Sequence, residues 1–174
     1  QQDSETLLND WCVLMLPTNY SSSSAPIRLI IFCHGAGSGV TSSASQTETM
    51  ALAKYLVTEG FAVLDVNGNP TSDSGTHPQE NMGSTNAMQS YIKAYQYVVE
   101  NYNIAKDGVH LHGASMGGLS SLNLIYSNAI KVISVSLHCP VTNMKDQAWD
   151  NPWFTDDWGT RFHIAKFFNF DAFD

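Results

Sequence analysis

The chain has 174 residues and a formal net charge of −8, from 16 acidic and 8 basic residues. Its hydrophobic fraction of 43% is sufficient for a folded core, and its length favours one domain or one domain with a small appendage. The charge argues against a nucleic-acid partner, because phosphate contacts need clustered lysine and arginine. No apolar run approaches the roughly 20 residues that span a bilayer, so we expect no membrane partner either.

The first residues, QQDSETLLND, contain neither an initiator methionine nor the charged-then-apolar pattern of a signal peptide. We therefore expect that the start was cut, processed or chosen in cloning. A composition rich in Ser, Thr and Asn, with few Lys residues, leans slightly towards an extracellular or virion-associated protein.

Cys12, Cys33 and Cys139 lack metal-like spacing, and their odd number leaves at least one outside an intramolecular disulfide. Cys12 and Cys33 lie in apolar, strand-like runs, which favours buried thiols over a bridge between them. The cysteines therefore do not decide the redox compartment.

The hydrophobic pattern alternates between buried-strand runs and segments with a helical period. In chain order it predicts strands or helices over residues 12–16 (strand), 28–33 (strand), 47–58 (helix), 61–66 (strand), 86–102 (helix), 109–112 (strand), 117–126 (helix) and 132–137 (strand). This alternation predicts a three-layer α/β/α fold, with a mostly parallel sheet and helices on both faces.

The last part of the chain differs in character from the rest. We expect one core over residues 1–148, followed by an aromatic-rich segment over residues 149–174. The aromatic residues of this segment, which follow no clean period, are Trp149, Trp153, Phe154, Trp158, Phe162, Phe167, Phe168, Phe170 and Phe173. They either cover an edge of the core or form a cap over a pocket.

The stretch Gly113–Gly117 (GASMG) fits the pattern G-x-S-x-G between a predicted strand and a predicted helix. That context is typical of a nucleophile elbow, in which the serine has a strained backbone and the positions two residues away must lack Cβ. Ser115 is therefore a candidate nucleophile. The alternative is a glycine-rich turn with a spectator serine. A phosphate-binding turn is disfavoured, because the chain has no G-x-G-x-x-G or Walker lysine.

A second glycine-rich motif, Cys33–Gly39 (CHGAGSG), follows a predicted buried strand. Acyl transfer needs two backbone N–H groups aimed at the developing oxyanion. Met116, directly after the serine, would supply one, and Ala36, or else Gly37, would supply the other. Both loops are expected at the same edge of the sheet. The alternative is a flexible turn with no role.

Together, IIFCHGAG and HLHGASMGG resemble the α/β-hydrolase superfamily, in its esterase and peptidase-like branches, over residues 11–137. The resemblance implies Ser115 as nucleophile, an oxyanion hole from Ala36 and Met116, and His34 bracing its loop rather than acting as base. It implies a serine hydrolase of the esterase type, with a peptidase as the alternative. The Trp and Phe residues of segment 149–174 are suited to stacking on a sugar ring or an aromatic acid, which favours an acylated carbohydrate as substrate, and a small ester fits equally well. We expect no cofactor, and the His, Asp and Glu spacing predicts no metal site.

The acid and the base of a triad are not evident from the sequence. In the superfamily they follow the serine, but the remaining sequence carries neither H-G-x-x-D nor a Gly-His near its end. Three explanations stay open: a longer hydrolase that carries them on further sequence, a rearranged triad, or a binding module that kept the fold. A rearranged triad would use His163 with one of Asp146, Asp150, Asp156 and Asp157.

Other polar residues near the predicted site have weaker assignments. His138 either lines the pocket or has a structural role, and His110 and His112 are predicted to be satisfied core groups. Asp65 and Asn67 end a strand near the site and shape the pocket without a chemical role. The sequence does not decide the oligomeric state.

Overall fold

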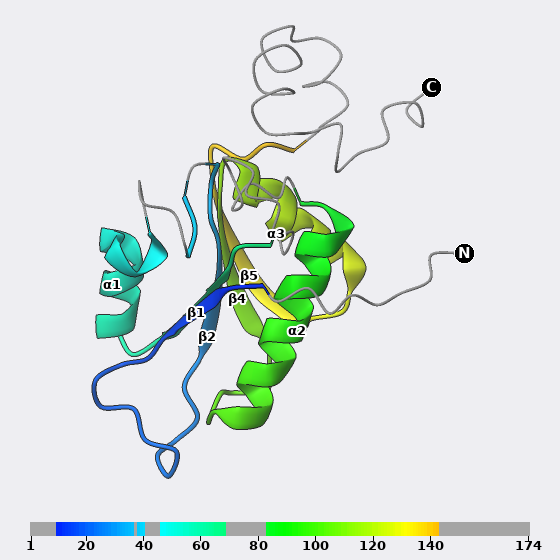
Figure 1. Ribbon diagram of the computed structural model, residues 1–174. Coiled ribbons are helices and arrows are strands. Elements are labelled where there is room, and N and C mark those ends of the chain that lie inside the picture. Colours follow the sequence, from blue (N-terminus) through cyan, green and yellow to red (C-terminus); the bar gives the residue numbers. More distant parts are fainter. Residues whose placement is uncertain (1–9, 37, 41–45, 69–82, 143–174) are drawn as a thin grey trace, which may run out of the picture.

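The computed structural model describes residues 10–36, 38–40, 46–68 and 83–142. Their elements are β1 (Cys12–Met15), β2 (Leu29–Cys33), the 3-10 turn η1 (Thr47–Thr49), α1 (Ala51–Thr58), β3 (Ala62–Val66), α2 (Thr85–Asn101), β4 (Val109–Ala114), α3 (Met116–Ser127) and β5 (Val132–His138). The five strands form one sheet in the order β1-β3-β2-β4-β5 (Figure 1).

The sheet is mostly parallel, as the sequence predicted. β1 runs antiparallel to β3, whereas β3, β2, β4 and β5 are parallel to one another. β2 lies at the centre, and all five of its residues are buried. This position explains its continuous apolar run, since a strand covered on both faces has no polar side.

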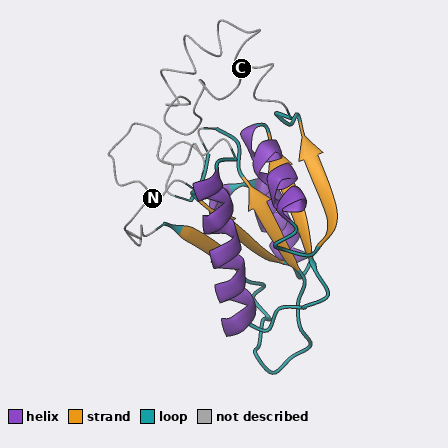
Figure 2. Cartoon of the chain, turned by 90° about the vertical axis from the view of Figure 1, so that its right-hand side faces the viewer, coloured by secondary structure: helices purple, strands orange, loops and turns teal. Residues whose placement is uncertain are grey.

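Helices cover both faces of the sheet (Figures 1 and 2). α2 and α3 lie on one side, over the larger core, to which the inner strands contribute Ile31, Leu64 and Leu111. On the other side, α1 contributes Ala53 to a smaller cluster with Phe32 and Val63. The three-layer prediction is therefore confirmed.

The outer strand β5 of the described sheet is less covered. On this strand, Ile133 is 45% exposed and Val135 is 40% exposed.

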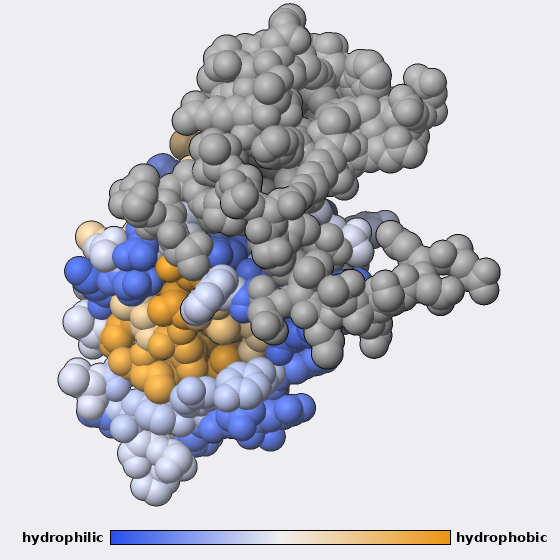
Figure 3. Space-filling model, viewed as in Figure 1, coloured by the Kyte–Doolittle hydropathy of each residue, from blue (hydrophilic) through white to orange (hydrophobic). Residues whose placement is uncertain are grey.

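On the side of α1 and β1, the surface is apolar at its centre and hydrophilic around it (Figure 3). Within the described ranges, none of the helices has the length and apolarity that a membrane crossing requires.

Two sequence predictions about this part of the fold need correction. The predicted helix over residues 47–58 is split, because Met50 has an extended backbone (ψ 133°) between η1 and α1. The Thr47 hydroxyl donates to the carboxylate of Asp65, a tertiary contact that overrides local helix propensity. Cys12 is a free thiol but exposed, because β1 is an outer strand of the described sheet. Cys33, on central β2, is free and buried as predicted.

Candidate active site

Ser115 forms the turn between β4 and α3 with φ 50° and ψ −116°. This conformation costs a residue with a Cβ roughly 1–3 kcal/mol and persists only where neighbouring contacts enforce it. The Ser115 N–H donates to the carbonyl of His138, and the Ser115 carbonyl accepts from the N–H groups of Val141 and Gly118, each at 2.9 Å. The turn thus has the strained, enforced geometry that the G-x-S-x-G pattern predicts.

Glycines on both sides of Ser115 make this turn possible. A Cβ on Gly113 would lie 2.6 Å from the Gly117 carbonyl oxygen, and a Cβ on Gly117 would lie 2.5 Å from the Cys33 carbonyl carbon. A Cβ on Gly118 would collide with Pro140. The start of α3 therefore packs directly on the backbone at the end of β2. Its first amides and the positive end of its dipole lie beside the serine.

The loop after β2 lies against this turn; its described residues are 34–36 and 38–40. Strands β2 and β4 are parallel and Cys33 pairs with Gly113, so the loops after the two strands leave the sheet at the same edge, as predicted. A Cβ on Gly35 would lie 3.3 Å from the Ala114 carbonyl oxygen and 3.6 Å from Ser115 Cβ. Ala36, the predicted oxyanion donor, is half-buried in the next position of this loop.

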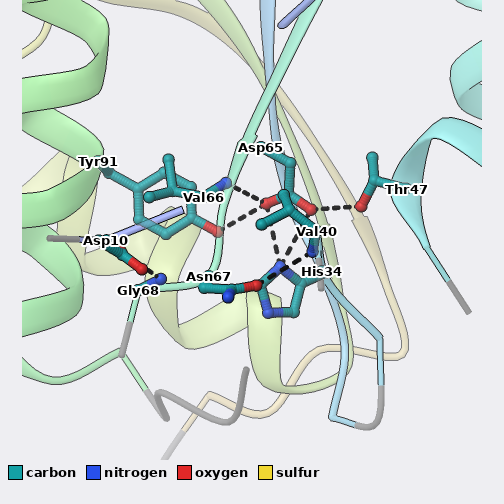
Figure 4. A network of polar contacts seen from close by, with 9 residues as sticks. All are labelled: Asp10, His34, Val40, Thr47, Asp65, Val66, Asn67, Gly68 and Tyr91. Atoms are coloured by element: carbon teal, nitrogen blue, oxygen red, sulfur yellow. Dashed lines mark hydrogen bonds and ion pairs between the residues drawn. The ribbon is translucent and has the colours of Figure 1, made fainter. Parts of the chain in front are cut away.

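A buried polar network anchors this loop to the end of β3 (Figure 4). The Asp65 carboxylate has 0% exposure and accepts from His34 Nδ1 at 3.0 Å to each oxygen, and from the Thr47 hydroxyl. It also accepts from the Tyr91 hydroxyl (3.1 Å) and the Val66 N–H (2.8 Å). A carboxylate only accepts, so Nδ1 is the protonated nitrogen of His34 when it donates here.

Burial and the nearby charge keep the Tyr91 hydroxyl and the Cys33 thiol protonated. Burial first, and the nearby Asp65 charge second, raise the pKa of Tyr91 well above its ordinary value. Burial raises the pKa of the Cys33 thiol to about 12. Neither group is therefore a candidate nucleophile, because it is the thiolate or phenolate that reacts.

The structure brings together most of the predicted site residues that it describes. Ser115 and Met116 share the turn, and His34 and Ala36 share the adjoining loop. Met116 is fully buried, and exposed His138 ends β5 beside the serine, in register with Ala114. The predicted residues that lie outside the described residues are Gly37, Asp146, Asp150, Asp156, Asp157, His163 and the segment 149–174.

The prediction that His110 and His112 are satisfied core groups is wrong. His110 Nδ1 pairs with the Ser134 hydroxyl at 2.8 Å, but its buried Nε2 has no hydrogen-bond partner in the described part of the chain. His112 is half-buried, with its ring 4.6 Å from that of Phe32. Both histidines project on the α1 side of β4, where the adjacent strand β5 is largely exposed.

His112 is expected to make the stability of the fold depend on pH. Burial first, and the His138 charge second, lower the pKa of His112 from its ordinary 6.5. The unfolded chain then binds the proton more readily, so the free energy of unfolding should fall as the pH drops below 6.5 and level off below the folded-state pKa. Urea unfolding of the wild type and of His112→Gln between about pH 7.5 and 5.5 measures this. The variant should lose less stability on acidification, and equal losses would contradict the assignment.

A family model named Esterase, with the description "Putative esterase", matches residues 10–166. The chain belongs to this esterase family. Membership agrees with the resemblance and with the enzyme class predicted from the sequence, an esterase-type hydrolase of the α/β-hydrolase fold. No curated protein sequence matches the chain.

Solved structures share the fold of this esterase-family chain at low sequence identity. An S-formylglutathione hydrolase from Agrobacterium tumefaciens has 16% identity and a TM-score of 0.63, over 92% of this chain and 66% of that one. A ferulic acid esterase from Anaeromyces mucronatus has 18% identity and a TM-score of 0.56, over 76% and 54%. A "putative dipeptidyl aminopeptidase IV" from Bacteroides ovatus has 18% identity and a TM-score of 0.58, over 75% and 19%. The esterase-family chain thus spans between 19% and 66% of these three proteins.

Proposed function

We propose that this chain carries the nucleophile and the oxyanion hole of a serine hydrolase that cleaves small carboxylic esters by acyl transfer. The observation that carries the proposal is Ser115, which is held at φ 50° on the strand-to-helix turn. Strain of this kind is retained where a side chain must be presented in one orientation. The adjoining loop after β2 brings further backbone amides to the same edge of the sheet.

In the proposed reaction, Ser115 Oγ attacks the carbonyl carbon of the ester while a histidine removes the hydroxyl proton. The carbonyl oxygen becomes an oxyanion, which accepts hydrogen bonds from the amides of Met116 and Ala36. The same histidine returns the proton to the leaving alcohol. Water then hydrolyses the acyl-serine and releases the acid. Each oxyanion donor contributes about 3–4 kcal/mol to the transition state.

The proposed base and acid lie outside the described residues. The His34 side chain, at the start of the loop after β2, is fully buried and donates its Nδ1–H hydrogen bond to Asp65, so it is suited to bracing the loop. The base is then either His163, with Asp146, Asp150, Asp156 or Asp157 as the acid, or a residue on further sequence of a longer protein.

The proposed substrates are small esters and acylated carbohydrates. The family description names an esterase, and one structural neighbour is a ferulic acid esterase. A peptidase is the second candidate, because one structural neighbour is titled as an aminopeptidase. Matched ester and amide substrates with the same acyl group separate the two, and we expect only the ester to be turned over.

A fluorophosphonate probe tests whether Ser115 is activated. Intact-protein mass spectrometry should show a single adduct on the wild type and none on Ser115→Ala, because only an activated serine attacks the probe at phosphorus. A folded wild type without an adduct would contradict activation within this chain. Ligand binding that is unaffected by Ser115→Ala would then favour a binding module that kept the hydrolase fold.

A further inference from the structure

We propose that Asp65 and Asn67, at the carboxyl end of β3, are positioning residues that hold the loop after β2 in the geometry required for oxyanion binding. This inference rests on the proposed function and adds two residues to its site. Neither residue belongs to a predicted motif, and both act through hydrogen bonds to the loop, without a part in the chemical step.

Asp65 fixes the start of the loop through His34. The His34 and Asp65 side chains are both fully buried, with Nδ1 at 3.0 Å from each carboxylate oxygen. The next residue along, Gly35, packs against Ser115. An ion pair or charge-assisted hydrogen bond in such a dry position fixes direction as well as distance. The contact with Asp65 of β3 therefore fixes the orientation of the peptide planes that follow His34.

Asn67 fixes the far side of the same loop. Its Oδ1 accepts from the Val40 N–H at 3.1 Å, and Asn67 itself is 2% exposed. The loop closes on itself through the Ser38 N–H, which donates to the Gly35 carbonyl at 3.1 Å. It is also tied to the start of η1, because the Thr47 N–H donates to the Gly39 carbonyl at 3.2 Å.

Thr47 connects Asp65 to the far side of the loop. Its hydroxyl donates to the Asp65 carboxylate, which also accepts from His34, and its backbone N–H donates to the Gly39 carbonyl. Both ends of the loop are therefore hydrogen-bonded to side chains of one short segment, Asp65-Val66-Asn67. A buried carboxylate with this many donors costs desolvation, and using it to orient a catalytic loop accounts for its place inside an otherwise apolar strand.

Amide hydrogen exchange tests the positioning role in any folded sample, whether or not it is active. The variants are Asp65→Asn and Asn67→Ala, and the control is Val98→Ala, a core truncation two turns beyond Tyr91 on α2. We expect the Ser38 and Thr47 amides to exchange at least about 10-fold faster in both variants than in the control, because local opening no longer has to break these contacts. Equal exchange in all three proteins would overturn the inference. If Asp65→Asn does not fold, Asn67→Ala decides the result, since it removes no buried charge.

Kinetics on an ester and its matching thionoester link the loop to the oxyanion. The thionoester sulfur accepts N–H hydrogen bonds weakly, so its hydrolysis depends less on the oxyanion hole. For Asp65→Asn and Asn67→Ala we expect kcat/KM for the ester to fall roughly 10- to 100-fold, with a much smaller loss for the thionoester. Equal losses on both substrates would show a merely structural role. If Ser115→Ala retains ester hydrolysis, the proposed function fails, while faster exchange in the loop would still support its anchoring by β3.

Discussion

Replacing Ser115 by alanine is expected to lower kcat/KM for ester hydrolysis by roughly 10⁴- to 10⁶-fold, because the acyl-enzyme can no longer form. Replacing it by glycine should cause the same loss. The two variants differ in stability. Alanine keeps the Cβ and with it the strain at φ 50°, whereas glycine relieves it.

The expected gain in stability for Ser115→Gly is about 1 kcal/mol, from roughly 1–3 kcal/mol of relieved strain less about 0.5–1 kcal/mol of added chain entropy. Urea unfolding and initial-rate kinetics on both variants provide the measurements. A pair that is inactive but equally stable would show that Ser115 is unstrained in solution. If both variants retain activity, a residue other than Ser115 is the nucleophile. The combination of lost activity and gained stability is the expected signature of a residue kept strained for function.

The sequence predicted the strands of the sheet to within a residue or two, most directly where a strand has the same environment along its whole length. β2 and β3 are buried on both faces, so they appear as continuous apolar runs. The elbow was also predictable, since a strained serine against a neighbouring strand requires glycines at fixed positions, Gly113 and Gly117. Both signals depend on residues close together in the chain, so they can be recognised in a single sequence.

The resemblance implied that His34 braces its loop, but its partners in the anchoring network were not predicted, because the network joins residues far apart in the chain. The sequence analysis gave Asp65 and Asn67 no more than a shaping role. One signal pointed further: Asp65 interrupts the apolar run of β3, and a charge inside a buried strand must find partners. The identity of those partners, His34, Thr47 and Tyr91, depends on how the loop and α2 meet the sheet.

The histidines of β4 show the opposite case, in which a local signal was misread. His110 and His112 alternate with buried Val109 and Leu111, a period of two that is typical of a strand with one half-covered face. They were predicted to be satisfied core groups, which requires a strand that is covered on both faces. β4 is flanked by β2 and β5, but β5 is the outer strand of the described sheet and leaves that face open.

Replacing Gly117 by alanine is expected to destabilise the fold by about 4 kcal/mol or to prevent folding. The added Cβ would overlap the carbonyl oxygen of Cys33 and lie 2.7 Å from that of His34. Both obstacles are backbone atoms of the strand and loop that adjoin the site, so neither can rotate away. Relief requires α3 to move off β2, and such a movement would also displace Ser115.

Gly60→Ala is the matched control for this glycine substitution. Gly60 has φ +93° but no atom within 4 Å of an added Cβ, so its replacement incurs backbone strain without a clash. A loss of about 1 kcal/mol is expected there. Urea unfolding of both variants separates the two effects, and similar losses would show that α3 does not pack on β2 as closely as described. A much larger loss at Gly117 would tie the elbow's glycine to the approach of helix and strand, the same contact that sets the serine beside the loop after β2.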